Sequence, residues 1–143
     1  MKALSIKQPW ATLIRDGVTL PDGSTWHKTV EGRSWPTSFR GPLVIHASKT
    51  PDKAACRMFG LCGPLGVTVA QVDLVDCVRG TRALDQRCIP PRSTDPCYEL
   101  FDNYDDDSEW WAWVFADVRP LAPRRVRGRL GLWDIADDLV VPA

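Results

Sequence analysis

A short polar segment between two tryptophans, TWHKTVEGRSW, carries the side chains best suited to chemistry, namely Lys28, Glu31 and Arg33. Held together, an ammonium, a carboxylate and a guanidinium could bind a phosphate or a base edge, and desolvation would lower the pKa of the lysine. The alternative is a salt-bridge ladder on an edge strand. In an extended strand Glu31, Arg33 and Trp35 share one face. Lys28 joins them only if the chain kinks, as Gly32 would allow.

Further side chains are candidates for the same ligand site. Trp10 and Trp35 could stack on a base, and Gln8 could hydrogen-bond to a base edge. For Trp10 the alternative is an ordinary core contact. His46 is also a candidate ligand-binding residue, although a single histidine in an apolar strand is more typical of a structural role. Lys49 follows at the end of that strand, where a loop residue could reach the cleft.

The charge pattern suggests a surface for an anionic partner. The formal net charge is zero, which argues against a protein that coats long nucleic acids by bulk electrostatics. Two segments nevertheless differ sharply, since residues 101–109 hold five acids and no base while residues 119–129 hold five arginines and no acid. We expect the arginines to form a basic, phosphate-binding strip beside the cleft. The alternatives are two solvated faces, or segments that pair with each other.

The composition narrows the remaining classes. Five cysteines lack the two-residue spacing of a zinc site or redox dithiol, and there are only two histidines, so we expect free thiols, no metal and no cofactor. The first apolar run is broken at once by Lys7, Gln8 and Pro9, which predicts neither a secretory leader nor a membrane span and favours the cytoplasm. Seven tryptophans exceed the needs of so small a core, so some should face a ligand.

The elements that must position these side chains follow from periodicity and turn signals. A helix is expected at 8–17, with Pro9 in its first turn and Gly17 as its stop, and a second at 50–60, with Thr50 as cap and Pro51 at the first helical position. A hairpin should turn at 21–24. Residues 79–109 read as a long connection, with one helical turn near 97–104.

Strands are predicted at 2–6, 42–48, 66–78, 110–121 and 124–135, with Trp111 and Trp113 on one face and Trp110 on the other. This is an α+β pattern, most economically a curved sheet or partly closed barrel with helices at its ends.

Four segments, in order, resemble the ASCH domain family, relatives of the PUA-like RNA-binding fold. They are LSIKQPWATLIRDG, KTVEGRSW, RGPLVIHASK, and WAWVFADVRPL with RGRLGLWDI. The similarity runs from about residue 2 to 136 and is weakest across residues 79–109. The family's hallmark is a glycine, a lysine, a glutamate and an arginine, and Lys28, Glu31 and Arg33 match its spacing. The hallmark glycine normally stands two places before the lysine, whereas ten residues separate Gly17 from Lys28. We interpret these ten residues as a hairpin insertion whose Trp26 and His27 add to the ligand wall.

The resemblance implies one PUA-like domain over residues 1–143, a small β-barrel of about six strands with two or three short helices. It also implies a cleft built by the QPW helix start and the K-x-x-E-x-R segment. Such a cleft is expected to bind RNA, another single-stranded nucleic acid or a nucleoside. Which of these is the ligand, and the oligomeric state, stay open.

A second reading of the resemblance is an enzyme. Some similar proteins are amidohydrolases that deacetylate acetylcytidine with a lysine, a threonine and a later glutamate, and others are suggested to cut RNA. Lys28 matches, but Glu31 stands where the threonine would be, and a carboxylate cannot act as that hydroxyl nucleophile. With Glu31 as general base and Lys28 polarising a carbonyl, a hydrolase remains chemically feasible, with Asp73 or Asp76 as the later acid. We favour the binding domain.

Overall fold

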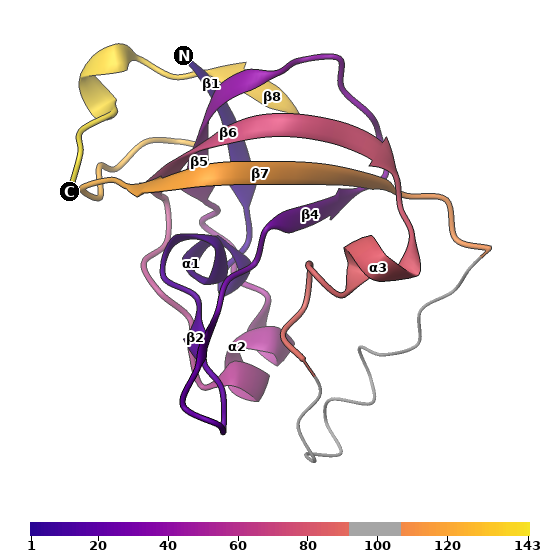
Figure 1. The fold of residues 1–143 in the computed structure, drawn as a ribbon. Helices are drawn as coiled ribbons and strands as arrows, with labels where there is room; N and C mark the ends of the chain where they lie inside the picture. The colour runs from indigo at the N-terminus through magenta and orange to yellow at the C-terminus, as the bar shows by residue number, and fades with distance from the viewer. Residues whose placement is uncertain (92–106) are drawn as a thin grey trace.

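In the computed structural model, which describes residues 1–91 and 107–143, six strands form one mixed sheet. The sheet order is β4-β7-β6-β5-β1-β8, in which β1 and β5 run parallel and every other neighbouring pair is antiparallel. The strands are β1 (Lys2–Ile6), β4 (Val30–Arg33), β5 (Gly41–Ala47), β6 (Val67–Arg79), β7 (Trp111–Pro120) and β8 (Leu132–Asp134). Figure 1 shows the sheet curled into a half-barrel, which confirms the predicted α+β class and barrel-like sheet.

The curl of the sheet comes from its two longest strands. The β6–β7 register shifts between Gln71 and Asp73 and again between Leu74 and Asp76, and the β5–β6 register shifts between Ile45 and His46. Each extra residue on one strand of an antiparallel pair bends that strand and increases its local twist. As a result β6 bends along its length, and the edges of the sheet approach one another.

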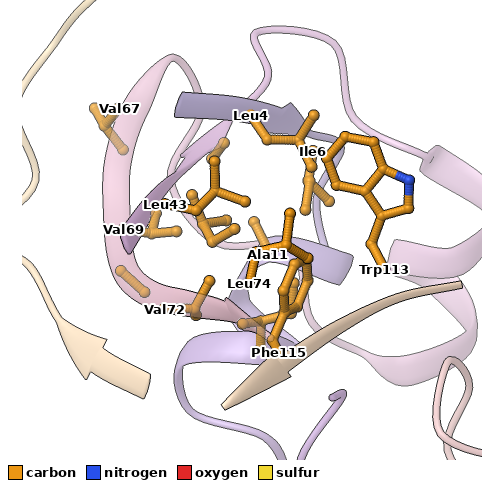
Figure 2. Packing of buried hydrophobic residues seen from close by; sticks show 14 of the residues in the cluster. Leu4, Ile6, Ala11, Leu43, Val67, Val69, Val72, Leu74, Trp113 and Phe115 are labelled. Atoms are coloured by element: carbon orange, nitrogen blue, oxygen red, sulfur yellow. The ribbon is translucent and has the colours of Figure 1, made fainter. Parts of the chain in front are cut away.

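The concave face of the half-barrel holds the main core. Helix α1 (Trp10–Arg15) packs against β5, β6 and β7 and places Ala11 and Ile14 among the apolar side chains of the sheet. Figure 2 shows Ala11 beside Leu74 and Phe115, and Trp113 next to Ile6 at the right of the view. Trp113 is fully buried and Trp111 packs against the same cluster, whereas Trp110 packs against a separate cluster, as the predicted alternation requires.

The first helix begins later than predicted. Pro9 is the residue before the helix rather than part of its first turn, and the amide of Thr12 donates to the side-chain oxygen of Gln8 at 3.0 Å. The Gln8 side chain thus satisfies one of the free amides at the helix start, in the way a capping residue would. Gly17 ends the helix with a positive φ of 72°, as expected. It is followed by the predicted hairpin, β2 (Val18–Thr19) and β3 (Thr25–Trp26).

Helix α2 (Lys53–Phe59) is capped by Asp52, not by Thr50, and Pro51 lies outside it. The Asp52 carboxylate accepts a hydrogen bond from the amide of Ala55 at 3.1 Å, which makes it the stronger cap. Gly60 closes the helix in the left-handed conformation.

Two predictions for the second half of the chain need correction. The long connection contains a helix that the sequence did not reveal, α3 (Arg82–Asp85), capped by Thr81; the turn expected at 97–104 lies outside the described residues. The strand expected at 124–135 is regular only in β8, and a one-turn 3₁₀ helix (Asp137–Leu139) follows. Residues 124–130, which we call the basic strap, instead cross the start of β6, where Arg125 forms an isolated bridge with Val67.

Candidate functional site

The three charged residues of the polar segment converge on one face. The Lys28 ammonium lies 3.5 Å from Oε1 of Glu31, and Oε2 of Glu31 lies 3.7 Å from Nη2 of Arg33. The kink that brings Lys28 to this face is not at Gly32, which pairs regularly with Ala112. It lies just before β4, where two successive amides, those of residues 29 and 30, donate to the same carbonyl oxygen of Arg87. The alternation of side chains therefore slips by one residue at this point.

Lys28, a candidate residue of the ligand site, is buried. The residue is only 2% exposed. Its ammonium donates to the carbonyl oxygen of Cys88 at 2.8 Å and lies 5.2 Å from the centre of the Trp10 ring. A buried charge needs such partners, and the carbonyl, the Glu31 carboxylate and the ring face supply them. Burial also raises the pKa of the neighbouring Cys88 thiol to about 11, although the positive charge of Lys28 opposes this shift.

Arg33 connects the charged segment to the first strand. Its Nη2 donates to the carbonyl oxygen of Ser5 at 2.7 Å, while its Nε is buried and has no hydrogen-bond partner among the described residues. The side chains of Glu31 and Arg33 are 13% and 26% exposed, so they are the parts of this cluster that a ligand can reach.

The other residues predicted for the cleft, Gln8, Trp10 and Trp35, all make contacts within the protein and differ in how far they are buried. Gln8 is fully buried; besides accepting from Thr12, its amide nitrogen donates to the carbonyl oxygen of Pro64 at 3.0 Å. Both ends of this side chain are thus bonded within the protein. Trp10 is half-buried and donates from its ring nitrogen to Asp52 at 3.2 Å. Trp35 packs edge-on against Trp113 with ring centres 4.7 Å apart.

His46 lies apart from this cluster, in a polar network beneath the basic strap. Its Nε2 is 2.8 Å from the carbonyl oxygen of Val126, and its Nδ1 is 3.0 Å from the hydroxyl of Ser5. A carbonyl only accepts, so Nε2 carries the proton and Nδ1 accepts from Ser5. The Ser5 hydroxyl in turn accepts from the ring nitrogen of Trp133 at 3.2 Å. Burial lowers the pKa of His46, although its hydrogen bond to the main chain of Val126 opposes this shift.

Above this network lies a cavity of about 1140 Å³ with a strongly basic lining. Among residues 1–91 and 107–143, five cationic side chains line it and no acidic one does; they are Lys7, Lys49, Arg125, Arg127 and Arg129. Sequence reasoning pointed to the arginines and to Lys49 but not to Lys7. Lys7 follows β1 and Lys49 follows β5, and because these strands are parallel neighbours their ends meet at one edge. That pairing has no local signal in the sequence.

These five cations form no ion pair with any residue in the described parts of the chain. Other surface cations do. Arg119, which belonged to the predicted strip, binds Asp73 at 2.8 Å, and Arg79 lies 3.6 Å from Glu109. The arginine strip is therefore shorter than predicted. Arg119, on β7, is paired with Asp73 of β6, whereas the cavity-lining arginines of the strap have no acidic partner in the described parts of the chain.

Within residues 1–91 and 107–143, no three histidine, cysteine or acidic side chains gather as a metal site would require. The helices there are too short and too polar to cross a membrane. The four described cysteines are free thiols, as predicted.

The fold is an α+β half-barrel, and its candidate functional features are the basic cavity and the charged segment. A family model for the ASCH domain matches residues 4–124, so the chain belongs to the ASCH domain family.

Solved structures with the same fold include an ASCH protein from Zymomonas mobilis, at 14% identity and a TM-score of 0.59, covering 96% of this chain and 88% of that one. A tyrosine-to-phenylalanine mutant of the Zymomonas protein aligns at 16% identity with a TM-score of 0.59, covering 96% and 91% of the two chains. A serine-to-alanine mutant of the same protein aligns at 17% identity with a TM-score of 0.58, covering 96% of this chain and 89% of that one. At these identities the likeness shows the fold alone. A comparison with curated proteins gives no significant match.

Proposed function

We propose that this ASCH domain binds RNA and that the part of the RNA it contacts is single-stranded. The observation that carries the proposal is the cavity, which in the described part of the chain is lined by five unpaired cations and no acid. Crowding like charges at one place destabilises a folded protein, and a polyanionic ligand removes that repulsion. The phosphate backbone of a nucleic acid is such a ligand, and it supplies most of the affinity of non-specific complexes.

The charged segment on β4 adjoins this cavity and supplies the second half of the proposed cleft. Arg33 is bonded to the main chain of Ser5, and Ser5 lines the cavity. A strand whose phosphates lie in the cavity would have its bases directed toward the partly exposed Glu31 and Arg33. The half-buried faces of Trp10 and Trp35 are the aromatic surfaces proposed for stacking, a contact worth roughly 1–3 kcal/mol per base.

The proposal is tested by titrating the protein with oligouridylate at several salt concentrations, with a duplex RNA of equal length as comparison. We expect the single strand to bind more tightly. The logarithm of its binding constant should fall with the logarithm of salt, by roughly 0.7 for each phosphate contact. Lys7→Gln with Lys49→Gln should weaken binding, and Lys53→Gln, a change at an exposed lysine outside the cavity, should not. A binding constant that does not change with salt concentration would contradict the proposal. So would an equal loss of affinity in the Lys7→Gln/Lys49→Gln and Lys53→Gln variants.

A hydrolase is the second candidate, and one observation favours it. The Glu31 carboxylate is partly exposed and is held between the Lys28 ammonium and the Arg33 guanidinium, at 3.5 and 3.7 Å. A carboxylate fixed in this way could act as general base toward a water molecule. The test is to incubate the protein with acetylcytidine and with single-stranded RNA and to analyse the products. Turnover that disappears in Glu31→Gln, while RNA binding persists, would establish the enzyme.

A further inference from the structure

Residues 125–129 of the basic strap alternate between inward and outward positions, whereas Arg124 and Leu130 at its two ends are both exposed. Val126 and Gly128 are partly buried, whereas Arg125, Arg127 and Arg129 are exposed. Alternation with a period of two is the pattern of an extended chain, in which every second side chain points the same way. The three arginines therefore form a row on the outer side of the strap, and all three line the basic cavity.

The inward residues fix the position of this row. The amide of Val126 donates to the carbonyl oxygen of Gly66 at 3.2 Å, and its own carbonyl oxygen accepts from His46 at 2.8 Å. Gly128 packs closely against Ser5 of β1 and His46 of β5. A Cβ added at Gly128 would stand 2.5 Å from the Ser5 hydroxyl and 2.8 Å from the nearest ring atom of His46. No larger residue fits at 128 without displacing the strap. The extended conformation and the register of the arginines are thus set by contacts to β1 and β5.

The spacing of the row matches a specific ligand. Alternate residues of an extended chain are about 6–7 Å apart, which is close to the separation of consecutive phosphates in an extended nucleic-acid strand. A compact anion such as a single phosphate would engage one guanidinium and leave the others unpaired. Lys7 and Lys49, at the ends of β1 and β5, line the same cavity and can hold the strand from its other side.

We propose that Arg125, Arg127 and Arg129 form a ladder that binds three consecutive phosphates of an extended single strand, one arginine to each phosphate. This inference rests on the proposed function and adds the minimum length of the ligand and its direction, parallel to the strap. A tetranucleotide without terminal phosphates is the shortest RNA that fills the ladder, because it contains three phosphodiester groups.

The test compares five variants, namely three single variants, the triple variant that combines them and one control. Each is titrated with a length series of oligouridylates without terminal phosphates, and binding is measured by tryptophan fluorescence at several salt concentrations. Three of the variants are Arg125→Gln, Arg127→Gln and Arg129→Gln. The matched control is Arg124→Gln, since Arg124 is exposed and lies in the same segment but does not line the cavity. Each ladder variant should reduce the salt slope for the tetranucleotide by roughly 0.7, and the control should leave it unchanged. For the triple variant, the loss of affinity relative to the parent should grow from the dinucleotide to the tetranucleotide and then stay constant.

The outcomes separate the ladder from the function on which it rests. If the parent binds oligouridylate but Arg124→Gln weakens binding as much as the ladder variants do, the ladder is wrong and RNA binding stands. If the loss in the triple variant does not depend on length, the one-to-one register is wrong. If the parent binds no oligouridylate at any salt concentration, both proposals fail. Gly128→Ala provides a second check, because a displaced strap should lower the salt slope even though all three arginines remain.

Discussion

The guanidinium of Arg33 donates a hydrogen bond to the carbonyl oxygen of Ser5 at 2.7 Å, and this bond joins two strands that are not neighbours in the sheet. Arg33 ends β4, which forms one edge of the sheet, and Ser5 lies on β1, next to the opposite edge. The β1–β8 pairing stops at Leu4, so the Ser5 carbonyl is left for the arginine. One side chain thereby bridges the open side of the half-barrel.

Arg33→Lys should therefore destabilise the protein although the charge is kept. Nη2 of Arg33 contacts both the Ser5 carbonyl and Glu31, whereas a lysine side chain is one atom shorter and its ammonium ends near the position of Cζ. An unsatisfied partly buried acceptor costs roughly 1–3 kcal/mol. Urea unfolding measures the change. Arg40→Lys is the control, because Arg40 also donates to main-chain carbonyls but is exposed. Equal stability of the two variants would show that the bridge contributes nothing.

Lys28→Met should lower the free energy of unfolding of the protein, in addition to removing a ligand contact. The change leaves the Cys88 carbonyl without its donor and the Glu31 carboxylate without its nearest cation. Removing one partner of a buried pair costs about 3 kcal/mol at the lower end of the usual range, and the partial exposure of Glu31 argues for that end. The measurement is the free energy of unfolding in urea, compared with Lys53→Met at an exposed lysine. A Lys28→Met protein as stable as its parent would mean that the ammonium is held there for the ligand alone.

Gly17→Ala and Gly23→Ala form a matched pair for the inserted hairpin. Both glycines have positive φ, 72° and 86°, so both variants pay a backbone strain of about 1–2 kcal/mol. An added Cβ at Gly17 would collide with the carbonyl oxygen of Trp26, whereas at Gly23 it would meet nothing within 4 Å. Gly17→Ala should therefore lower the melting temperature more than Gly23→Ala. Equal shifts would show that the hairpin does not dock against the end of α1.

Acid should loosen the strap through His46. Burial lowers the pKa of this ring in the folded protein, so the folded state favours the neutral form more than the unfolded chain does. The stabilisation is complete above the unfolded value of about 6.5 and is lost as the pH falls below it. His46→Gln keeps an amide donor for the Val126 carbonyl and does not titrate, so its free energy of unfolding should fall less between pH 7 and pH 5. Parallel pH profiles for the two proteins would contradict this.

The strands of the sheet could be predicted because their sequences are locally decisive. The run from Leu43 to Ala47 is fully buried, and an apolar run of this length is typical of an interior strand. What the sequence could not supply is the partner of each strand. The parallel pairing of β1 with β5 joins residues 2–6 to 43–47, and no local propensity encodes it. The position of Lys7 beside Lys49 depended on this pairing and was missed for that reason.

The charged cluster was predictable from spacing, but its environment was not. The K-x-x-E-x-R pattern indicated that three charges could meet, and they do. The burial of Lys28 depends on the Cys88 carbonyl, 60 residues further along the chain, in a stretch that read as an irregular connection. Position-specific burial of this kind arises from tertiary packing, so residue types alone do not reveal it.

The pairing of β1 with β8 has a consequence for biosynthesis. Lys2 lies opposite Asp134, so the outer neighbour of β1 is made almost a whole chain later. At the usual pace of translation the delay is on the order of ten seconds. Throughout this interval the outer edge of β1 is open to any extended peptide nearby, and an exposed strand edge is a site of misassembly. A nascent chain that terminates before residue 132 keeps that edge permanently, so premature termination close to the end should yield aggregates rather than a slightly shortened protein.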